Sequence, residues 1–127
     1  MINKIYKNKK IVVTGHTGFK GSWLCFWLYL SGADIYGISK SIPTNPSLFK
    51  ILNIKKLIKK DYRINVKDNK KLKNLIEKIE PEIIFHLAAQ ALVKKSYKET
   101  LETFLTNTVG TLNILDIIYN CKKKINL

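Results

Sequence analysis

Three regularly spaced glycines are the residues in this sequence most able to support chemistry. Gly15, Gly18 and Gly21 lie in the segment TGHTGFKG (14–21), between a short apolar run and a long hydrophobic stretch. In such a context the first glycine permits a tight turn, the second lets a phosphate approach the backbone, and the third allows a helix to pack on a strand. Bare amides at a helix start attract anions. The segment is therefore predicted to hold a diphosphate; the alternative is a turn that only connects two elements.

Alternating apolar runs predict the elements that position this turn. Continuous β-branched runs are typical of buried strands, and apolar residues at helical spacing are typical of helices. The predicted strands are Lys10–Thr14, Asp34–Ile38, Ile64–Val66 and Glu82–Leu87, with Ile125–Leu127 as the first residues of a fifth. The predicted helices are Phe19–Ser31, ended by Gly32, short turns within Leu48–Lys60, Asn69–Ile79, capped by Asp68, and Lys98–Asn120.

Strands separated by helices imply a parallel sheet. We therefore predict an α/β fold, a Rossmann-type doubly wound parallel sheet with strand order 3-2-1-4, whose fifth strand is cut off, in one domain over residues 1–127. The side chains expected to face the sheet from the last helix are Leu101, Phe104, Leu105, Val109, Leu112 and Leu115. An open apolar edge on the fourth strand predicts low stability or self-association.

The residue after the second predicted strand bears on the choice of dinucleotide. In NAD-preferring domains an acidic residue about 20 positions beyond the first glycines accepts hydrogen bonds from the ribose hydroxyls. This place holds Ser39, followed by Lys40, which makes Ser39 the candidate residue at the ribose. Because no carboxylate stands there to repel a 2′-phosphate, the sequence leaves NADP open beside NAD.

Composition and charge argue against several other classes. The net charge of +14 would suit nucleic-acid binding, but Arg63 is the only arginine, and the lysines are scattered rather than gathered in one motif. No apolar run reaches the length of a membrane span and no signal peptide is apparent, which predicts a cytoplasmic protein. Cys25 and Cys121 form no pattern typical of zinc sites or disulfides, so no metal is expected.

The motifs resemble those of a known enzyme family. The spacing TGxxGxxG, with HLAAQ (86–90) after the fourth predicted strand and TNTVGT (106–111) in the following helix, is similar to the extended short-chain dehydrogenase/reductase family of nucleotide-sugar enzymes. More narrowly, four segments resemble the CDP-glucose 4,6-dehydratases within it; they are Gly15–Leu24, Pro43–Phe49, Phe85–Val93 and Ser96–Tyr97. The resemblance extends over essentially the whole chain, and Pro43–Phe49 is its most discriminating segment.

The resemblance implies an NAD-dependent lyase and names its cofactor residues. In that family NAD takes a hydride from C4 of the sugar, water leaves across C5 and C6, and the hydride returns to C6. The backbone implied to meet the pyrophosphate is that of Thr17, Gly18, Phe19, Lys20 and Gly21. The residues implied to lie beside the adenosine half are Leu87, Ala88, Ala89 and Gln90, with Thr106 approaching from the helix. Asn65 and Val66 stand where the family has an aspartate and a hydrophobic residue at the adenine ring; Asn65 brings no charge, which bears on affinity rather than pose.

No catalytic residue is predicted in this chain. In the family it resembles, the YxxxK pair and the acid groups for dehydration lie downstream of the equivalent of Leu127, so residues 1–127 are expected to be an N-terminal part without the substrate domain, inactive alone. Tyr97 lacks a lysine at the required spacing, and Tyr119 lies at a helix end. His16, His86 and Asn107 are expected to make local hydrogen bonds.

Three interpretations stay open at this point. The first is the incomplete dehydratase, whose full-length form takes a nucleotide-sugar substrate and for which a homo-oligomer is a further expectation. The second is a stand-alone dinucleotide-binding module, and the third is a truncated sugar-nucleotide epimerase or reductase. A downstream YxxxK sequence would favour an enzyme over the module.

Overall fold

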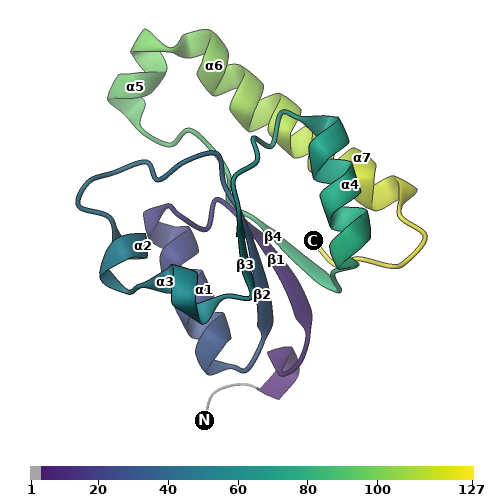
Figure 1. Cartoon of the computed structure of the whole chain (residues 1–127). Coiled ribbons are helices and arrows are strands. Elements are labelled where there is room, and N and C mark those ends of the chain that lie inside the picture. Colours follow the sequence, from purple (N-terminus) through teal and green to yellow (C-terminus); the bar gives the residue numbers. More distant parts are fainter. Residues whose placement is uncertain (1–3) are drawn as a thin grey trace.

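A parallel sheet of four short strands forms the middle of the protein. The computed structural model describes residues 4–127, and Figure 1 shows the sheet between two layers of helices. The strands are β1 (Lys10–Thr14), β2 (Asp34–Ile38), β3 (Lys60–Tyr62) and β4 (Ile83–His86), in the order β3-β2-β1-β4. All pairings are parallel, with Val12 opposite both Tyr36 and Ile84. The predicted α/β class and strand order are confirmed.

The third strand lies earlier than predicted. The sequence predicts it at Ile64–Val66, whereas β3 is Lys60–Tyr62 and pairs with the end of β2. β3 is an edge strand whose residues are exposed or half-exposed, so it lacks the apolar run that marks a buried strand. The apolar signal comes instead from the following loop, where Val66 is buried in the core.

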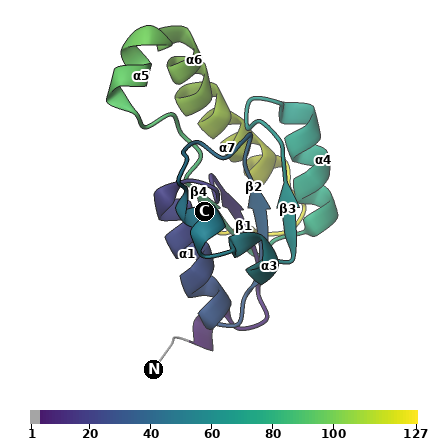
Figure 2. The ribbon, with the colours of Figure 1, turned by 60° about the vertical axis from the view of Figure 1, so that its left-hand side comes forward.

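Three helices cover one face of the sheet. They are α1 (Phe19–Leu30), α2 (Leu48–Ile51) and α3 (Ile54–Leu57), and Figure 2 shows α1 and α3 on the same side. A 3-10 turn, η1 (Lys4–Tyr6), precedes β1. The buried side chains of this layer are Ile11, Val13, Cys25, Leu28, Ile35, Phe49, Ile54 and Ile58. Gly32, at φ 77°, follows the end of α1 in the left-handed conformation predicted for a helix C-terminus.

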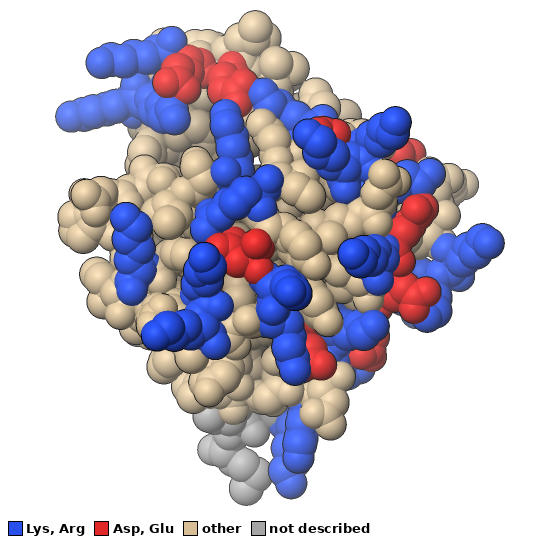
Figure 3. Space-filling model, viewed as in Figure 1, with Lys and Arg blue, Asp and Glu red and all other residues tan. Residues whose placement is uncertain are grey.

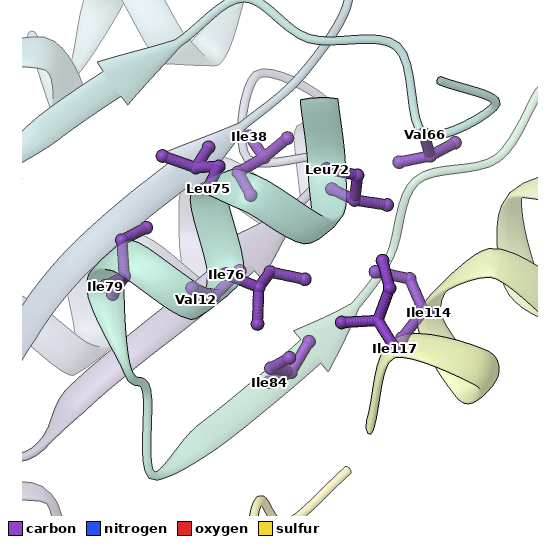
Figure 4. Packing of buried hydrophobic residues seen from close by; sticks show 10 residues of the cluster. All are labelled: Val12, Ile38, Val66, Leu72, Leu75, Ile76, Ile79, Ile84, Ile114 and Ile117. Atoms are coloured by element: carbon purple, nitrogen blue, oxygen red, sulfur yellow. The ribbon is translucent and has the colours of Figure 1, made fainter. Parts of the chain in front are cut away.

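The second layer consists of α4 (Asn69–Ile79) and α7 (Gly110–Asn120). As predicted, Asp68 caps α4, because its carboxylate accepts a hydrogen bond of 3.2 Å from the amide of Lys71. Figure 4 shows the side chains of α4 and α7 meeting over Val12 and Ile84 of the sheet. The two buried clusters, one on each face, hold the carboxyl ends of the central strands in place.

The helix predicted at Lys98–Asn120 is present as an unbroken helical run from Thr100 to Asn120, but a π-helical turn interrupts its α-helical repeat and a short extra helix precedes it. A short helix, α5 (Val93–Lys98), lies where a loop is predicted, and α6 (Thr100–Phe104) follows it. A π-helical turn, η2 (Leu105–Val109), then joins α6 to α7. A π turn adds one residue to the helical repeat, and such turns are frequent at functional sites.

The prediction of which side of this helix faces the sheet is wrong for four residues. Leu101, Phe104, Leu112 and Leu115 are between 46% and 72% exposed, while Leu105 and Val109 are half-buried. The inward side of α7 is set instead by Gly110, Ile114 and Ile117. A Cβ added at Gly110 would come within 2.6 Å of the Val66 side chain, so this glycine determines which face of α7 packs inward.

The last residues begin a fifth parallel pairing. Asn126 forms an isolated bridge with Ile83, in which the amide of Ile84 donates to Asn126 at 2.8 Å and the amide of Asn126 donates to Glu82 at 3.0 Å. This agrees with the predicted start of a fifth strand at 125–127. Within residues 4–127, no helix is both long and apolar enough to cross a membrane. The prediction that the chain starts without a signal peptide falls partly on residues 1–3, outside the described part.

Candidate functional site

The three glycines lie at the junction of β1 and α1, as predicted. Gly15 has φ 74°, and its amide donates to the carbonyl of Ile38 at 2.8 Å, which ties the turn to the end of β2. A Cβ there would come within 2.7 Å of the Leu87 and Ala88 backbone. A Cβ on Gly21 would overlap the Gly15 carbonyl oxygen, so both positions require glycine for backbone packing.

Gly18 differs because the space beside it is open. An added Cβ would meet only the Gly15 carbonyl oxygen, at 3.4 Å, and Gly18 has an extended conformation that any residue adopts. It caps α1 without a side-chain hydrogen bond. The Gly18 amide donates to the Gly15 carbonyl at 3.0 Å. The first amides of a helix have no intrahelical acceptor, so Phe19 and Lys20, beside the open space at Gly18, form an approachable backbone edge with the positive end of the helix dipole.

Thr17 is held differently from its neighbours. Its amide points to the Ser39 hydroxyl at 3.4 Å, and its own hydroxyl donates to the carbonyl of Ser41 at 2.6 Å. Both Thr17 and Ser39 are buried. The structure thus places Thr17 as a link between the glycine turn and the loop after β2, while the amides of Phe19 and Lys20 stay open.

A buried histidine connects this turn to β3. The His16 ring is fully buried; its Nε2 lies 2.9 Å from Asp61 and its Nδ1 lies 2.9 Å from the Ser39 hydroxyl. Because a carboxylate only accepts, Nε2 carries the proton and Nδ1 accepts from Ser39. Burial lowers the pKa of His16 below its ordinary value, and the Asp61 carboxylate offsets only part of this effect. His16 is therefore neutral, and the prediction of local hydrogen bonds is confirmed.

The hydrogen bonds from Ser39 through His16 to Asp61 form a chain, the His16 relay, which continues outward from Asp61. Its second oxygen accepts from the Arg63 guanidinium at 2.8 Å, and Arg63 lies over the Phe49 ring at 5.4 Å. Sequence reasoning missed Asp61 because no pattern on a short polar edge strand marks a residue that contacts a turn 45 positions away. The only signal available was a histidine in a buried turn, which requires a hydrogen-bonding partner.

On the other side of β1, a second histidine organises the loop after β4. The Thr14 hydroxyl accepts from the amides of Leu87 and Ala88, each at 3.2 Å, and donates to His86 at 2.7 Å. His86 in turn reaches the Thr111 hydroxyl at 3.1 Å, and burial lowers its pKa. The backbone that the sequence predicts beside the adenosine is thus fixed to both β1 and α7.

Gln90 is held by the π-helical turn. Its amide donates to the Asn107 side chain at 2.8 Å, and the Asn107 amide group donates back to the Gln90 carbonyl at 3.2 Å. This confirms the predicted structural contact of Asn107 with a neighbouring loop. Ala89, between these anchored residues, lies on the same connection.

The residues predicted at the adenine ring lie beside a cluster of ion pairs. Val66 is buried, and the Asn65 side chain accepts from the amide of Lys67 at 3.1 Å. The Glu102 carboxylate pairs with Lys67 at 2.5 Å and with Lys40 at 3.5 Å. The Thr106 hydroxyl donates to Glu102 at 3.4 Å, so this glutamate, missed from the sequence, joins the loops after β2 and β3 to α6.

Taken by their place in the fold, the predicted residues gather at one edge of the sheet. Parallel strands bring their carboxyl ends to the same side, where doubly wound folds bind ligands. The glycine turn follows β1, Ser39 follows β2, and Leu87–Gln90 follow β4, while Asn65, Val66 and Thr106 border the same edge through the contacts above. The open backbone at Gly18, bordered by backbone that leaves no room for side chains, fits the diphosphate of a dinucleotide.

Comparison with known proteins supports this geometry. The family model for GDP-mannose 4,6 dehydratase matches residues 12–127. A CDP-glucose 4,6-dehydratase of Salmonella typhimurium is 43% identical over an alignment that covers 100% of this chain and 36% of that protein. Among solved structures, the UDP-glucose 4-epimerase of Thermotoga maritima aligns with TM-score 0.76 and 29% identity, over 91% of this chain and 36% of that one. The UDP-glucose 4-epimerase of Thermus thermophilus, in complex with NAD, aligns with TM-score 0.73 and 27% identity, over 85% of this chain and 33% of that one.

The chain spans about a third of the length of these relatives. The matched part is the glycine turn, the parallel sheet and the loops that border its carboxyl edge. Family model, sequence relative and fold therefore agree, and the chain belongs to the GDP-mannose 4,6-dehydratase family of nucleotide-sugar dehydratases and epimerases.

Proposed function

We propose that this chain is the nicotinamide-dinucleotide-binding part of a nucleotide-sugar dehydratase that converts CDP-glucose to its 4-keto-6-deoxy product. The observation that carries the proposal is the open backbone at Gly18, set between Gly15 and Gly21, whose replacement would strike backbone. The choice of CDP-glucose is supported by the 43% identity to the Salmonella enzyme along the whole chain. Within such an enzyme the chain contributes to a lyase reaction without supplying its acid and base groups.

The proposed roles follow from the positions of the residues. The backbone of Thr17–Gly21 borders the diphosphate; Phe19 and Lys20 offer amides of the first turn of α1, whereas the Thr17 amide is held by the Ser39 hydroxyl. Ser39 borders the ribose, and Asn65 and Val66 border the adenine. Leu87, Ala88, Ala89 and Gln90 line the opposite side, and Thr106 approaches from the π-helical turn.

We propose NAD as the cofactor. Support comes from the T. thermophilus epimerase, whose solved structure contains NAD. When bound, NAD supplies the hydride acceptor for C4 of the sugar. The residues of this chain bind and orient it: the Thr14 and His86 hydrogen bonds fix the loop after β4, and the His16 relay fixes the turn before α1. Ser39 places no carboxylate at the ribose, so NADP belongs in every binding test.

We also propose that the protein forms a homo-oligomer. The exposed apolar side chains of α6 and α7 follow one another along one helical face; they are Leu101, Phe104, Leu112 and Leu115. A contiguous apolar stripe of this kind on a helix surface is typical of a protein interface. The nucleotide-sugar partner rests on the relatives, and the cytoplasmic location stays a prediction from the sequence.

Calorimetry with NAD and with NADP tests the binding half of the proposal. We expect weak but saturable heat with at least one dinucleotide and no turnover of CDP-glucose by residues 1–127. Absence of heat with both dinucleotides at millimolar concentration would contradict it. Turnover of CDP-glucose by these residues alone would contradict the placement of the acid and base groups elsewhere.

An epimerase is the second candidate, because both solved structures described above are UDP-glucose 4-epimerases. If the reading frame continues beyond Leu127, its complete product decides between the two. Release of a 4-keto-6-deoxy sugar from CDP-glucose supports the dehydratase. Interconversion of UDP-glucose and UDP-galactose without loss of water supports the epimerase.

A further inference from the structure

A pocket lined by both charged and apolar side chains lies on the far side of the His16 relay from the glycine turn. Its volume is about 430 Å³, and it is an open hollow bordered by residues of α2, α3 and the end of β3. The lining residues are Ile42, Phe49, Lys50, Asn53, Lys55, Asp61 and Arg63. Figure 3 shows that, among the charged side chains on the face of the molecule that carries α2 and α3, basic ones outnumber acidic ones. None of the residues predicted to bind the dinucleotide lines this pocket.

The charges in this pocket do not balance. Three of its lining side chains are cationic and one is acidic. The two oxygens of Asp61 are already used, one by His16 at 2.9 Å and the other by Arg63 at 2.8 Å. Within residues 4–127, Lys50 and Lys55 have no acidic partner. The pocket therefore has an excess of positive charge directed at open space, which favours a bound anion.

Arg63 is held in place before any ligand arrives. Asp61 binds one side of its guanidinium, and the group lies over the ring of Phe49, which is buried and meets the His16 ring edge-on at 5.4 Å. The Arg63 side chain is still 37% exposed. A guanidinium fixed in this way loses little conformational freedom on binding, and its planar donor set matches phosphate oxygens.

We propose that this pocket binds a phosphomonoester dianion through Arg63, Lys50 and Lys55. A dianion matches the charge of the two unpaired lysines, and the apolar floor formed by Ile42 and Phe49 accommodates the ester side. Two sources share this chemistry. One is a free phosphorylated metabolite, and the other is the 2′-phosphate of NADP. The second source rests on the proposed function and on the hydrogen bonds that link Asp61 through His16 to Ser39, the residue proposed to border the ribose.

Inorganic phosphate is the probe for the test, titrated calorimetrically into the protein and compared with chloride at equal ionic strength. We expect saturable binding of phosphate in the millimolar range or below and none of chloride. The double variant Lys50→Gln/Lys55→Gln is expected to weaken phosphate binding about tenfold, the loss expected when charge-assisted contacts are removed. Arg63→Gln should weaken phosphate binding further. If the Arg63→Gln variant does not fold, the double variant decides the test.

The control is Lys56→Gln, which removes one positive charge from the residue next to Lys55 in α3, outside the pocket lining. It should bind phosphate like the parent protein. Equal weakening in the control and in the double variant, or no phosphate binding beyond that of chloride, would overturn the proposal. Gly18→Ala, which is designed to block dinucleotide binding, should leave phosphate binding in the pocket unchanged. A failure of the proposed dinucleotide binding can therefore be distinguished from a failure of the phosphate pocket.

Competition then identifies the source. Phosphate that displaces NADP but not NAD assigns the pocket to the 2′-phosphate of the cofactor. Phosphate that displaces neither dinucleotide assigns it to a free phosphomonoester. Phosphate that displaces both to the same extent in the parent and in the Lys50→Gln/Lys55→Gln variant would place it at the glycine turn and overturn the proposal.

Discussion

Alanine substitutions at Gly18 and Gly21 should separate the binding of the dinucleotide from the stability of the fold. At Gly21 an added Cβ would overlap the Gly15 carbonyl oxygen and lie 2.8 Å from His16 Cα, both backbone atoms. Gly15 has little room to yield, because its amide is bonded to Ile38 and its φ is 74°. At Gly18 the nearest atom is 3.4 Å away and the conformation suits alanine.

The expected magnitudes differ accordingly. Alanine inside a helix gains about 1 kcal/mol over glycine, whereas forcing atoms into a closely packed site costs about 1–3 kcal/mol or more. Because the overlap at Gly21 is with backbone, we expect the upper part of that range and a net loss of about 2 kcal/mol. This lowers the melting temperature by roughly 8 °C for a protein of this size. Gly18→Ala should lose less than about 1 kcal/mol, the cost of a weaker helix cap.

NAD affinity, unlike the stability of the fold, should be sensitive to the substitution at Gly18. The Gly18→Ala methyl group occupies the open edge where a diphosphate would approach, so NAD affinity should fall by about tenfold or more, or roughly 1.4 kcal/mol. Thermal unfolding followed by the fluorescence of Trp23 and Trp27, with calorimetry of NAD, measures both quantities. The reasoning is refuted if Gly18→Ala binds NAD as the parent does, or if Gly21→Ala melts at the parent temperature.

Three further outcomes are expected. Because burial lowers the pKa of His16 and of His86, the unfolded chain binds more protons than the folded protein below about pH 6.5, so the free energy of unfolding should fall as pH falls through that range. Denaturant titrations of the parent and of His16→Gln should show a shallower fall in the variant, and a parent stability independent of pH would contradict this. Glu102→Gln, which removes the ion pairs to the loops after β2 and β3, should weaken dinucleotide binding severalfold at low salt and less at high salt; equal affinity of variant and parent at low salt would argue against that role. Leu112→Glu places a charge in the exposed apolar stripe and should reduce the mass seen by sedimentation; a parent protein that is already monomeric would rule out the proposed homo-oligomer.

Local signals in the sequence predicted the central elements well. The run Lys10–Thr14, the glycine turn and the start of α1 are all determined by residues close in sequence, and they lie as predicted. The strand order follows from right-handed parallel crossovers, which leave few arrangements open. Gly32 and Asp68 mark helix ends through their own backbone and side-chain chemistry, so these boundaries were also accessible.

Features that depend on distant contacts were not accessible. β3 carries no apolar run because it lies at the edge, so Ile64–Val66 drew the prediction to the loop that follows. The π-helical turn at Leu105–Val109 has no sequence signature, and the close approach of Gly110 to Val66 that orients α7 appears only in three dimensions. Asp61 and Glu102 each join segments far apart in the chain, and a single charged residue on a lysine-rich surface gives no warning of that role.

Chemical-shift mapping of the backbone amides during an NAD titration tests the central claim most directly. We expect the largest shifts at Gly18, Phe19 and Lys20, with smaller ones along Leu87–Gln90, and we expect them to require at least about tenfold more NAD in Gly18→Ala. Shifts centred away from the start of α1, or shifts that persist unchanged in Gly18→Ala, would contradict a diphosphate held at the glycine turn.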